Sequence, residues 1–558
     1  MPNPIGKFCR SGAAFLFAAG TMTVAFAAPP PDAGMLIENL PTDQSSLRAD
    51  PPVKIEASRT SRLPSESTLR FKVNRIRIEG QDLYSEMELQ PFVKDAMGES
   101  VSLAELEKAC EQLSGFFHQQ GYFLADTIIP AQDVKDGVVR VIVLVGRYGT
   151  IDIQNHSTLQ SASIRRMLRG MKTGQFIKKE ELERTLLCLR DIGGIRAKAI
   201  LAPGKEAGSA NLIVNVENSE PFTGGIYFDN YGNRYSGERR TGFNLRLDNL
   251  SGNGDLLHLG GLLAEDGRVK EGGFFYQLPP DQFGGRLGIG YSRLGYSLGE
   301  EFSSLEAKGT AETLNIEQRI VLKRSRSGNR YLRLMYEQKN LEDRQDAVRY
   351  SVQKQTKVWS LGFAGEQVDR IGGGGVTSFF FTDAYGRLQL DQAAQAIDFS
   401  GPATAGNYNK IEAKVYRIQH LGQRLNLHLS FTGQMANRNL DSSERLYLGG
   451  ATGVRAYSQG EAGGDEGYIF SGECRWDLPT PRFQLAAFFD TGAVKINVSP
   501  WQPEENRRRL QGAGIGLRWN KLEDFSVQLD YAWKISSDGS ESDAADRGRF
   551  WLQGMKFF

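Results

Sequence analysis

The part of the chain from Pro221 to Phe558 consists of strand-like segments in which apolar and polar side chains alternate strictly. Residues 425–432 (LNLHLSFT) and 525–533 (FSVQLDYAW) are clear examples, and clusters of Gly, Asp, Asn and Ser separate the segments. Because successive side chains of a strand point to opposite faces, each segment has one apolar and one polar face. This pattern is typical of an outer-membrane β-barrel with a hydrated lumen, and it also occurs in soluble β-sandwiches.

The N-terminus favours the barrel, because it has the features of a secretory signal. Lys7 and Arg10 precede a mostly apolar run, and Ala25-Phe-Ala27 supplies the small residues of a cleavage site. Residues 1–27 are therefore predicted to be a signal peptide. After it, no apolar run approaches the roughly 18 residues that a membrane helix needs, so only a barrel could cross a membrane.

Aromatic residues near the ends of the predicted strands also favour a membrane barrel over a sandwich. They are Trp519, Tyr531, Trp533 and Trp551, and the chain ends on Phe558. A barrel in a bilayer must close, because hydrocarbon contains no water to satisfy a free sheet edge. We expect a transmembrane antiparallel β-barrel over residues 220–558, with sixteen strands at roughly 20 residues per strand and connection and both termini in the periplasm.

Two small α+β modules are predicted before the barrel, over residues 70–146 and 147–219. In each, a strand is followed by two helical segments and two further strands, and Leu106 of the first module aligns with Leu182 of the second. The β-α-α-β-β pattern therefore repeats. Residues 28–69 are rich in Pro, Ser, Asp and Arg and are predicted to be a linker.

Composition and charge exclude several functional classes. The chain has 67 basic and 66 acidic residues, so its net charge gives no reason to expect nucleic-acid binding. Its four cysteines and five histidines show no spacing typical of a zinc site, a disulfide framework or a catalytic triad. We expect no enzyme activity, and no catalytic, metal or cofactor site.

Two short motifs place charged residues among strand-like segments, where we expect a charge to have a partner. The first is Val454-Arg455-Ala456-Tyr457, and the second comprises Phe488, Asp490 and Gly492. Arg455 and Asp490 are candidate partners, since an arginine and a carboxylate form a geometrically specific bidentate pair. The alternative is that they are unrelated charges on the wet face of the barrel.

The chain resembles the transporters of two-partner secretion, known as TpsB proteins of the ShlB/FhaC/HecB type. The segments from Gly121 to Pro130 (GYFLADTIIP) and from Gly137 to Val143 (GVVRVIV) carry the resemblance in the modules, which are similar to POTRA domains. The motifs around Arg455 and Asp490 carry it in the barrel. The family belongs to the BamA/TpsB superfamily of outer-membrane proteins.

The resemblance implies a role for each motif. A long loop, about residues 436–466, is expected to fold into the barrel and to be fixed there by a salt bridge between Arg455 and Asp490. Ala456 departs from the family, which usually has Gly at this position, whereas Gly449 and Gly450 fit the family pattern. Phe558 is expected to end the C-terminal signal read by the outer-membrane barrel assembly machinery, although Lys556 interrupts its apolar register.

The function implied by the resemblance is translocation, with or without activation, of a large unfolded exoprotein of the adhesin or haemolysin kind. The POTRA domains would recognise the N-terminal secretion domain of this client in the periplasm, and the barrel would pass it through the outer membrane without ATP. The family can place a plug helix in the pore, for which residues 35–40 are the candidate. Lipid or lipopolysaccharide is a further expected partner, with Arg507-Arg-Arg509 in an outward loop as one contact.

Two other functions remain open from the sequence. The same architecture could insert other β-barrels into the membrane, as BamA does. A passive porin or a surface protein built on a barrel is the third alternative, although it would need neither tandem periplasmic modules nor a fixed loop.

Overall fold

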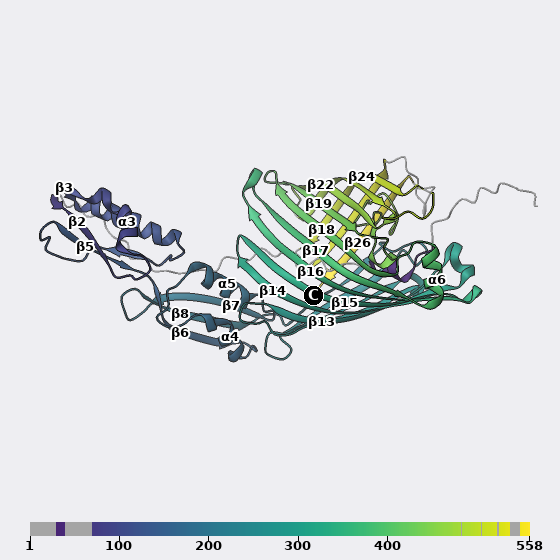
Figure 1. Ribbon diagram of the computed structural model, residues 1–558, viewed down its shortest axis with the longest axis horizontal. Coiled ribbons are helices and arrows are strands. Elements are labelled where there is room, and N and C mark those ends of the chain that lie inside the picture. Colours follow the sequence, from purple (N-terminus) through teal and green to yellow (C-terminus); the bar gives the residue numbers. More distant parts are fainter. Residues whose placement is uncertain (1–29, 39–69, 481, 504, 522–523, 536–546) are drawn as a thin grey trace, which may run out of the picture.

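The computed structural model describes residues 30–38, 70–480, 482–503, 505–521, 524–535 and 547–558. Two small modules extend from one end of a large barrel (Figure 1). The predicted signal peptide and most of the predicted linker lie outside the described residues. Within the described ranges, no helix is both long enough and apolar enough to span a membrane.

The C-terminal part of the chain is a closed antiparallel barrel of sixteen strands, as the alternating pattern predicts. Each strand pairs with its neighbours in the chain, and the last strand pairs with the first. The strands are β9 (Phe222–Asp229), β10 (Arg240–Asp248), β11 (Leu256–Ala264), β12 (Val269–Gln277), β13 (Arg286–Ser297), β14 (Ala307–Ser325), β15 (Gly328–Gln345), β16 (Tyr350–Asp369), β17 (Gly375–Leu390), β18 (Gly406–His420), β19 (Leu425–Ala436), β22 (Glu466–Asp477), β23 (Phe483–Lys495), β24 (Arg507–Lys521), β25 (Phe525–Lys534) and β26 (Gly548–Phe557).

The barrel wall differs in height around its circumference. Strands β9 to β12 have 8 or 9 residues, whereas β14 to β16 have 18 to 20. The closing ladder between β26 and β9 is short and runs from the pair Gln553↔Asp229 to the pair Phe557↔Gly225. Beyond it, the Asn230 side chain continues the contact, because its Nδ2 donates to Phe550 O at 2.9 Å.

The lumen contains two elements that are not part of the wall. One is the long connection between β19 and β22, residues 437–465, which includes the short helix η8 (Ser442–Glu444) and the two-stranded pair β20 (Leu446–Tyr447) and β21 (Gly463–Gly464). The other is helix α1 (Ala33–Glu38), which packs against η8 and strands β13 to β15. We call the connection formed by residues 437–465 the inner loop.

The first N-terminal module has a three-stranded sheet with the order β2-β5-β4, and helix α3 packs on it with its buried side chains. A capping box begins α3, because Ser102 and Glu105 exchange the hydrogen bonds expected of this motif. The elements of this module are β1 (Arg70–Val73), β2 (Arg75–Glu79), α2 (Glu86–Leu89), η1 (Gln90–Phe92), η2 (Lys94–Ala96), β3 (Gly98–Ser102), α3 (Leu103–Gln119), β4 (Asp126–Ile128) and β5 (Val138–Leu144).

The second module repeats the arrangement with the sheet order β6-β8-β7 and a core of its own. Its elements are β6 (Arg147–His156), α4 (Ser161–Met167), η3 (Leu168–Gly170), α5 (Lys179–Arg190), β7 (Ile195–Pro203) and β8 (Ser209–Asn218). In the first sheet β2 pairs with β5 in parallel and β4 is antiparallel to β5, and in the second β6 pairs with β8 in parallel and β7 is antiparallel to β8. The predicted α+β modules and membrane barrel are thus confirmed as the fold class.

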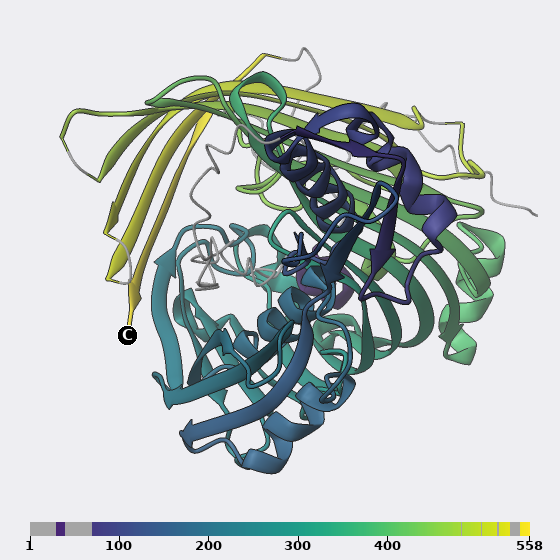
Figure 2. The same cartoon turned by 90° about the vertical axis from the view of Figure 1, so that its left-hand side faces the viewer.

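The second module is attached to the periplasmic end of the barrel. Figure 2 shows the molecule from this side, with the modules in front of the barrel. Helix α5 contacts β14, and Arg324 at the end of β14 forms a bidentate pair with Asp191, with N to O distances of 2.8 and 2.7 Å. Because a bidentate arginine pair fixes orientation as well as distance, this contact orients the module relative to the barrel.

Candidate functional site

The inner loop holds a buried arginine against the barrel wall. Arg455 is 6% exposed and donates from Nε to Asp490 Oδ2 and from a terminal nitrogen to Asp490 Oδ1, both at 2.9 Å. The Arg455 backbone N–H also donates to Asp490 Oδ2 at 3.2 Å. The structure therefore brings together the two residues that the sequence motifs single out, in the bidentate geometry that an arginine and a carboxylate favour.

Further charges surround this pair. Glu473 Oε2 lies 2.6 Å from Arg455, and Asp530 lies 3.6 Å from it. Arg518 contacts both of these carboxylates, with distances of 3.1 Å to Glu473 and 2.6 Å to Asp530. Buried carboxylates and guanidinium groups therefore alternate through the network, which is how buried charges are tolerated. Burial disfavours the cation, yet the hydrogen bonds that Arg455 donates to Asp490 and the charges of the neighbouring carboxylates raise the pKa of Arg455.

Aromatic residues complete the surroundings of Arg455. Its guanidinium carbon lies 3.3 Å from the centre of the Phe488 ring, which is the geometry of a cation–π contact. Trp551 is fully buried, and its Nε1 donates to the Arg455 carbonyl at 2.7 Å. Trp551 therefore differs from Trp533, which is exposed, because the Trp551 side chain points into the lumen and binds the tip of the inner loop.

Small residues allow the loop tip to approach the wall. Ala456 is 1% exposed, and a Cβ on Gly512 of the wall would lie 2.6 Å from its methyl group. Gly512 thus leaves the space that Ala456 fills. Ala456 is not one of the described non-glycine residues with a positive φ, so its backbone here does not require glycine. A Cβ on Gly492 would lie 2.9 Å from the Leu448 side chain of the loop.

The two loop glycines allow the inner loop to close on itself. A Cβ on Gly449 would lie 2.4 Å from the Ser458 carbonyl oxygen, so only glycine fits there. Gly450 has a φ of +133° and faces the Gln459 side chain. Val454 and Tyr457, the remaining residues of the first motif, are fully buried in the apolar cluster beneath the tip.

Helix α1 is held in the lumen by ion pairs to the wall and the inner loop. Asp32, which caps the helix by accepting from the Met35 N–H, lies 3.2 Å from Lys354 Nζ and 2.5 Å from Ser442 Oγ. At the other end, Glu38 lies 2.9 Å from Lys339 Nζ. The helix thus presents one carboxylate to each of two buried lysines.

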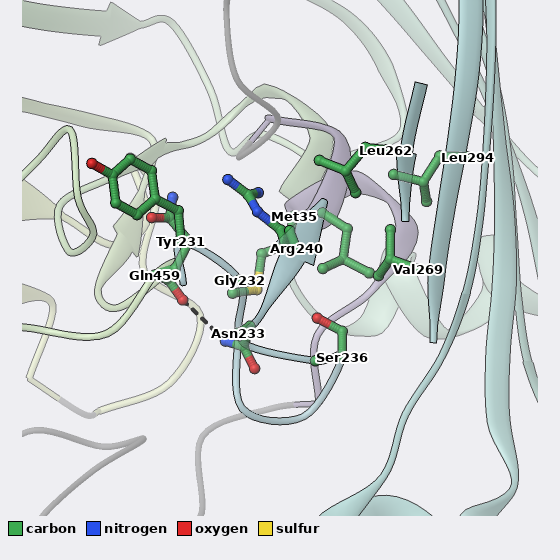
Figure 3. A pocket seen from close by; sticks show the side chains of 12 residues that line it. Met35, Tyr231, Gly232, Asn233, Ser236, Arg240, Leu262, Val269, Leu294 and Gln459 are labelled. Carbon is green, nitrogen blue, oxygen red and sulfur yellow. Dashed lines mark hydrogen bonds between the residues drawn. The ribbon is translucent and has the colours of Figure 1, made fainter. Parts of the chain in front are cut away.

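Helix α1 packs closely on the inner loop and on the first barrel strands. A Cβ on Gly34 would lie 2.5 Å from Ser442 Oγ and 2.6 Å from the Ser443 backbone nitrogen. A cavity of about 30 Å³ lies beside the helix and is lined by Met35, Arg240 and the wall residues Leu262 and Leu294, among others. Figure 3 shows these side chains. The same view shows the hydrogen bond of 3.0 Å from Asn233 Nδ2 to the Gln459 carbonyl of the inner loop.

Phe558 lies at the closing seam of the barrel. Its N–H donates to the Gly224 carbonyl at 3.0 Å, and its carbonyl accepts from the Gly224 N–H at 2.9 Å. Lys556, which interrupts the apolar register, pairs with Asp524 at the periplasmic turn. The expectation that residues 507–509 lie in a loop is wrong, because they begin β24, and Arg508 points to Glu461 of the inner loop at 3.3 Å.

A sequence model of the family described as "Haemolysin secretion/activation protein ShlB/FhaC/HecB" matches residues 208–519, which is more than half of the chain. The chain belongs to this family. A second model, "POTRA domain, ShlB-type", matches residues 71–146. The chain is therefore an outer-membrane transporter of the two-partner secretion type, with its POTRA modules in the periplasm.

Named relatives agree with this assignment. The "Heme/hemopexin transporter protein HuxB" of Haemophilus influenzae (strain 86-028NP) is 29% identical over 507 residues, which cover 88% of each chain. The "Outer membrane transporter CdiB" of Dickeya dadantii (strain 3937) is 23% identical over 499 residues, which cover 84% of this chain and 83% of the relative.

Solved structures show the same fold. CdiB from Escherichia coli superposes with a TM-score of 0.72 at 17% identity and covers 92% of this chain and 94% of its own. BamA from Haemophilus ducreyi lacking POTRA domains 1-3 has a TM-score of 0.51 at 15% identity, with 88% of this chain and 100% of that chain covered.

The sequence did not single out the charges that surround the Arg455 pair. The alternation places Glu473 and Asp530 only among the polar residues on the wet face of their strands, and nothing in the sequence marks Arg518. The alternation pattern could have pointed to these charges, since Glu473 occupies a lumen-facing position of its strand where a neutral polar residue would suffice. The partner of each charge depends on the register between strands, which a single sequence does not specify.

Proposed function

We propose that this chain captures a large unfolded exoprotein in the periplasm and passes it through its barrel to the cell surface. The observation that carries the proposal is a barrel whose lumen is occupied by two elements of its own chain, the inner loop and helix α1. A pore that is filled at rest and opened when one of these elements leaves suits a transporter of a long polypeptide, whereas a passive porin needs an open lumen.

The POTRA modules are the proposed receptor. In the described chain, β2 and β4 are the outer strands of the first sheet, and β6 and β7 those of the second. An extended client can add a strand to such an edge, where main-chain hydrogen bonds provide affinity without demanding one sequence. Strand β7, with nine residues, offers an edge long enough for this mode.

Within the barrel, we assign different roles to the two lumen elements. The inner loop is the fixed part, held to the wall by Arg455 and Asp490. Helix α1 is the plug, which must leave its place before the client enters. No catalytic step is assigned, and the free energy for transport would come from folding of the client outside the cell, since folding there prevents its return.

The client is proposed to carry an N-terminal secretion domain that the POTRA modules bind. HuxB is named a heme/hemopexin transporter and CdiB only an outer membrane transporter, so the relatives do not identify which exoprotein this chain exports. Assembly of the barrel by the outer-membrane machinery through the C-terminal signal at Phe558 is a further part of the proposal.

Quantitative mass spectrometry of outer membrane and culture medium, with and without this gene, tests the proposal. We expect one very large β-rich exoprotein to disappear from the surface and the medium while other outer-membrane barrels keep their levels. A joint fall of many barrels would instead indicate an assembly factor. An unchanged surface proteome would contradict both functions and favour a passive channel.

A further inference from the structure

Two cations face each other on the outer surface of the tall barrel wall. Lys357 on β16 and Arg387 on β17 are direct partners in the ladder between these strands, and both side chains are exposed. The even-numbered residues of β16 face the lumen. Lys354 shows this, because it contacts Asp32, the cap of helix α1, and Asp441 of the inner loop. Lys357 and Arg387 therefore point away from the lumen, toward the membrane side of the wall.

Like charges directly opposite each other destabilise a strand pair, so this arrangement needs a compensating anion. The lateral neighbours of the pair are the neutral residues Gln338 and Asn407, and the row beyond it is the neutral pair Gln355 and Gln389. Among the residues that the structure describes, no carboxylate lies within 4.0 Å of either cation.

The nearest outward carboxylate on β17 is already engaged. Asp383 lies four residues before Arg387, and its Oδ1 accepts from Asn409 Nδ2 at 2.6 Å. By contrast, Arg293 on the neighbouring part of the wall has its own partner, Glu312, at 3.5 Å. The cation pair is thus left for a ligand outside the chain.

The position of the pair relative to the membrane identifies the ligand. The row of the ladder next to it is the aromatic pair Trp359 and Tyr385, which are 64% and 55% exposed. Aromatic rings mark the interface of a membrane barrel. Thr377 lies near the periplasmic end of β17. The outward residues between it and Arg387 are, in order, Phe379, Phe381, Asp383 and Tyr385.

The height of this band agrees with a membrane. Ten residues of strand separate Thr377 from Arg387, which is roughly 33 Å along the strand. With strands tilted by about 40°, this becomes about 25 Å along the membrane normal, the height of the apolar band of outer-membrane barrels. Thr377 contacts Arg417, which is paired with Asp369 at the periplasmic end. Lys357 and Arg387 therefore lie at the outer boundary of the membrane.

We infer that Lys357 and Arg387 form a binding site for the phosphate of a glycolipid in the outer leaflet, with its acyl chains along Trp359 and Leu361. An arginine and a lysine together suit a phosphate, which can accept several hydrogen bonds and carries up to two charges. The site would fix the height of the tall wall in the membrane. It does not depend on the proposed transport function.

The test uses the full-length protein reconstituted with bis-phosphorylated lipid A or with lipid A that lacks both phosphates. Native mass spectrometry would measure how much of each lipid remains bound. We expect the wild type to prefer the phosphorylated lipid, and Lys357→Gln/Arg387→Gln to lose that preference by roughly 30-fold, since each cation near a membrane surface contributes about 1 kcal/mol and 1.4 kcal/mol is tenfold. The matched control is Arg293→Gln, which removes an outward cation that has a carboxylate partner.

An unchanged preference in the double variant would overturn the site, and so would an equal loss in Arg293→Gln. If the double variant does not assemble, a photo-crosslinking amino acid at Asn407 in the otherwise native chain replaces it. Labelling of phosphorylated lipid A well above the dephosphorylated lipid would support the site, and equal labelling of the two lipids would contradict it.

Discussion

The inner loop and helix α1 occupy the same lumen but are held in different ways. Glu473 and Asp530 also contact Arg518, but among the ion pairs of the described residues Asp490 has Arg455 as its cation. Removing Arg455 therefore leaves Asp490 buried without its main partner. Helix α1 instead supplies carboxylates to two lysines that also have other carboxylate partners. Without the helix, Lys354 still has Asp343 and Asp441 at 3.7 and 3.0 Å.

The second lysine shows the same redundancy. Lys339 contacts Glu38 of the helix, and it also lies 3.3 Å from Glu337 and 3.2 Å from Glu444. Burial opposes ionisation of Glu444, but the charges of Lys339 and Lys410 lower its pKa, so it remains charged beside the lysines. The difference indicates that the charges of the lumen tolerate the departure of the helix but not that of the loop tip.

The largest effect is expected from Arg455→Ala. Removing one partner of a buried pair leaves an uncompensated charge and costs about 3–5 kcal/mol. We expect the barrel to assemble, to melt at a lower temperature in a heat-modifiability assay, and to secrete its client at least tenfold less. The matched control is Arg475→Ala, which removes another lumen arginine bound to Glu473 without freeing the loop. Normal secretion by a folded Arg455→Ala variant would remove the role of the fixed loop.

A smaller effect is expected from Trp551→Phe. This change keeps a six-membered aromatic ring but removes the pyrrole half of the buried indole. The cost is the hydrogen bond to the Arg455 carbonyl, worth about 1 kcal/mol, together with the small cavity that is left. The melting temperature should fall slightly and secretion should be partly retained. Trp533→Phe, on the exposed outer surface, serves as the control. If both variants melt alike, the contact between Trp551 and the loop tip contributes nothing measurable.

The smallest effect on barrel stability is expected from Gly34→Leu. A side chain at Gly34 cannot fit against Ser442 and the Ser443 backbone, so helix α1 should lose its place. We expect the melting temperature to stay unchanged while the conductance in planar bilayers rises severalfold. Ile37→Leu, which keeps side-chain volume, should behave as the wild type. An unchanged current in Gly34→Leu would contradict the plug.

The sequence predicted the fold well because alternation over many strands leaves one solution in a membrane, a closed barrel. The length was consistent with sixteen strands without establishing that number, which the structure gives. The Arg455 and Asp490 pair was predicted from a family resemblance and from the chemistry of arginine. The remaining members of the network were not, since Glu473, Asp530 and Arg518 meet only through strand register.

One expectation was wrong for a physical reason. Residues 507–509 were placed in a loop because a run of arginines is usually solvated. Strand β24 instead continues through them, with Arg508 turned inward to Glu461.

The most direct test of the difference between loop and helix is a reversible tether. Cysteines at Asp32 and Ser442 lie close enough for a disulfide after a small shift, since the Asp32 carboxylate lies 2.5 Å from Ser442 Oγ. In a background with Cys474→Ser, we expect the oxidised double variant to assemble but not to secrete, the reductant to restore secretion, and both single variants to secrete throughout. Normal secretion with the disulfide fully formed would show that helix α1 does not need to leave, and would contradict the mechanism.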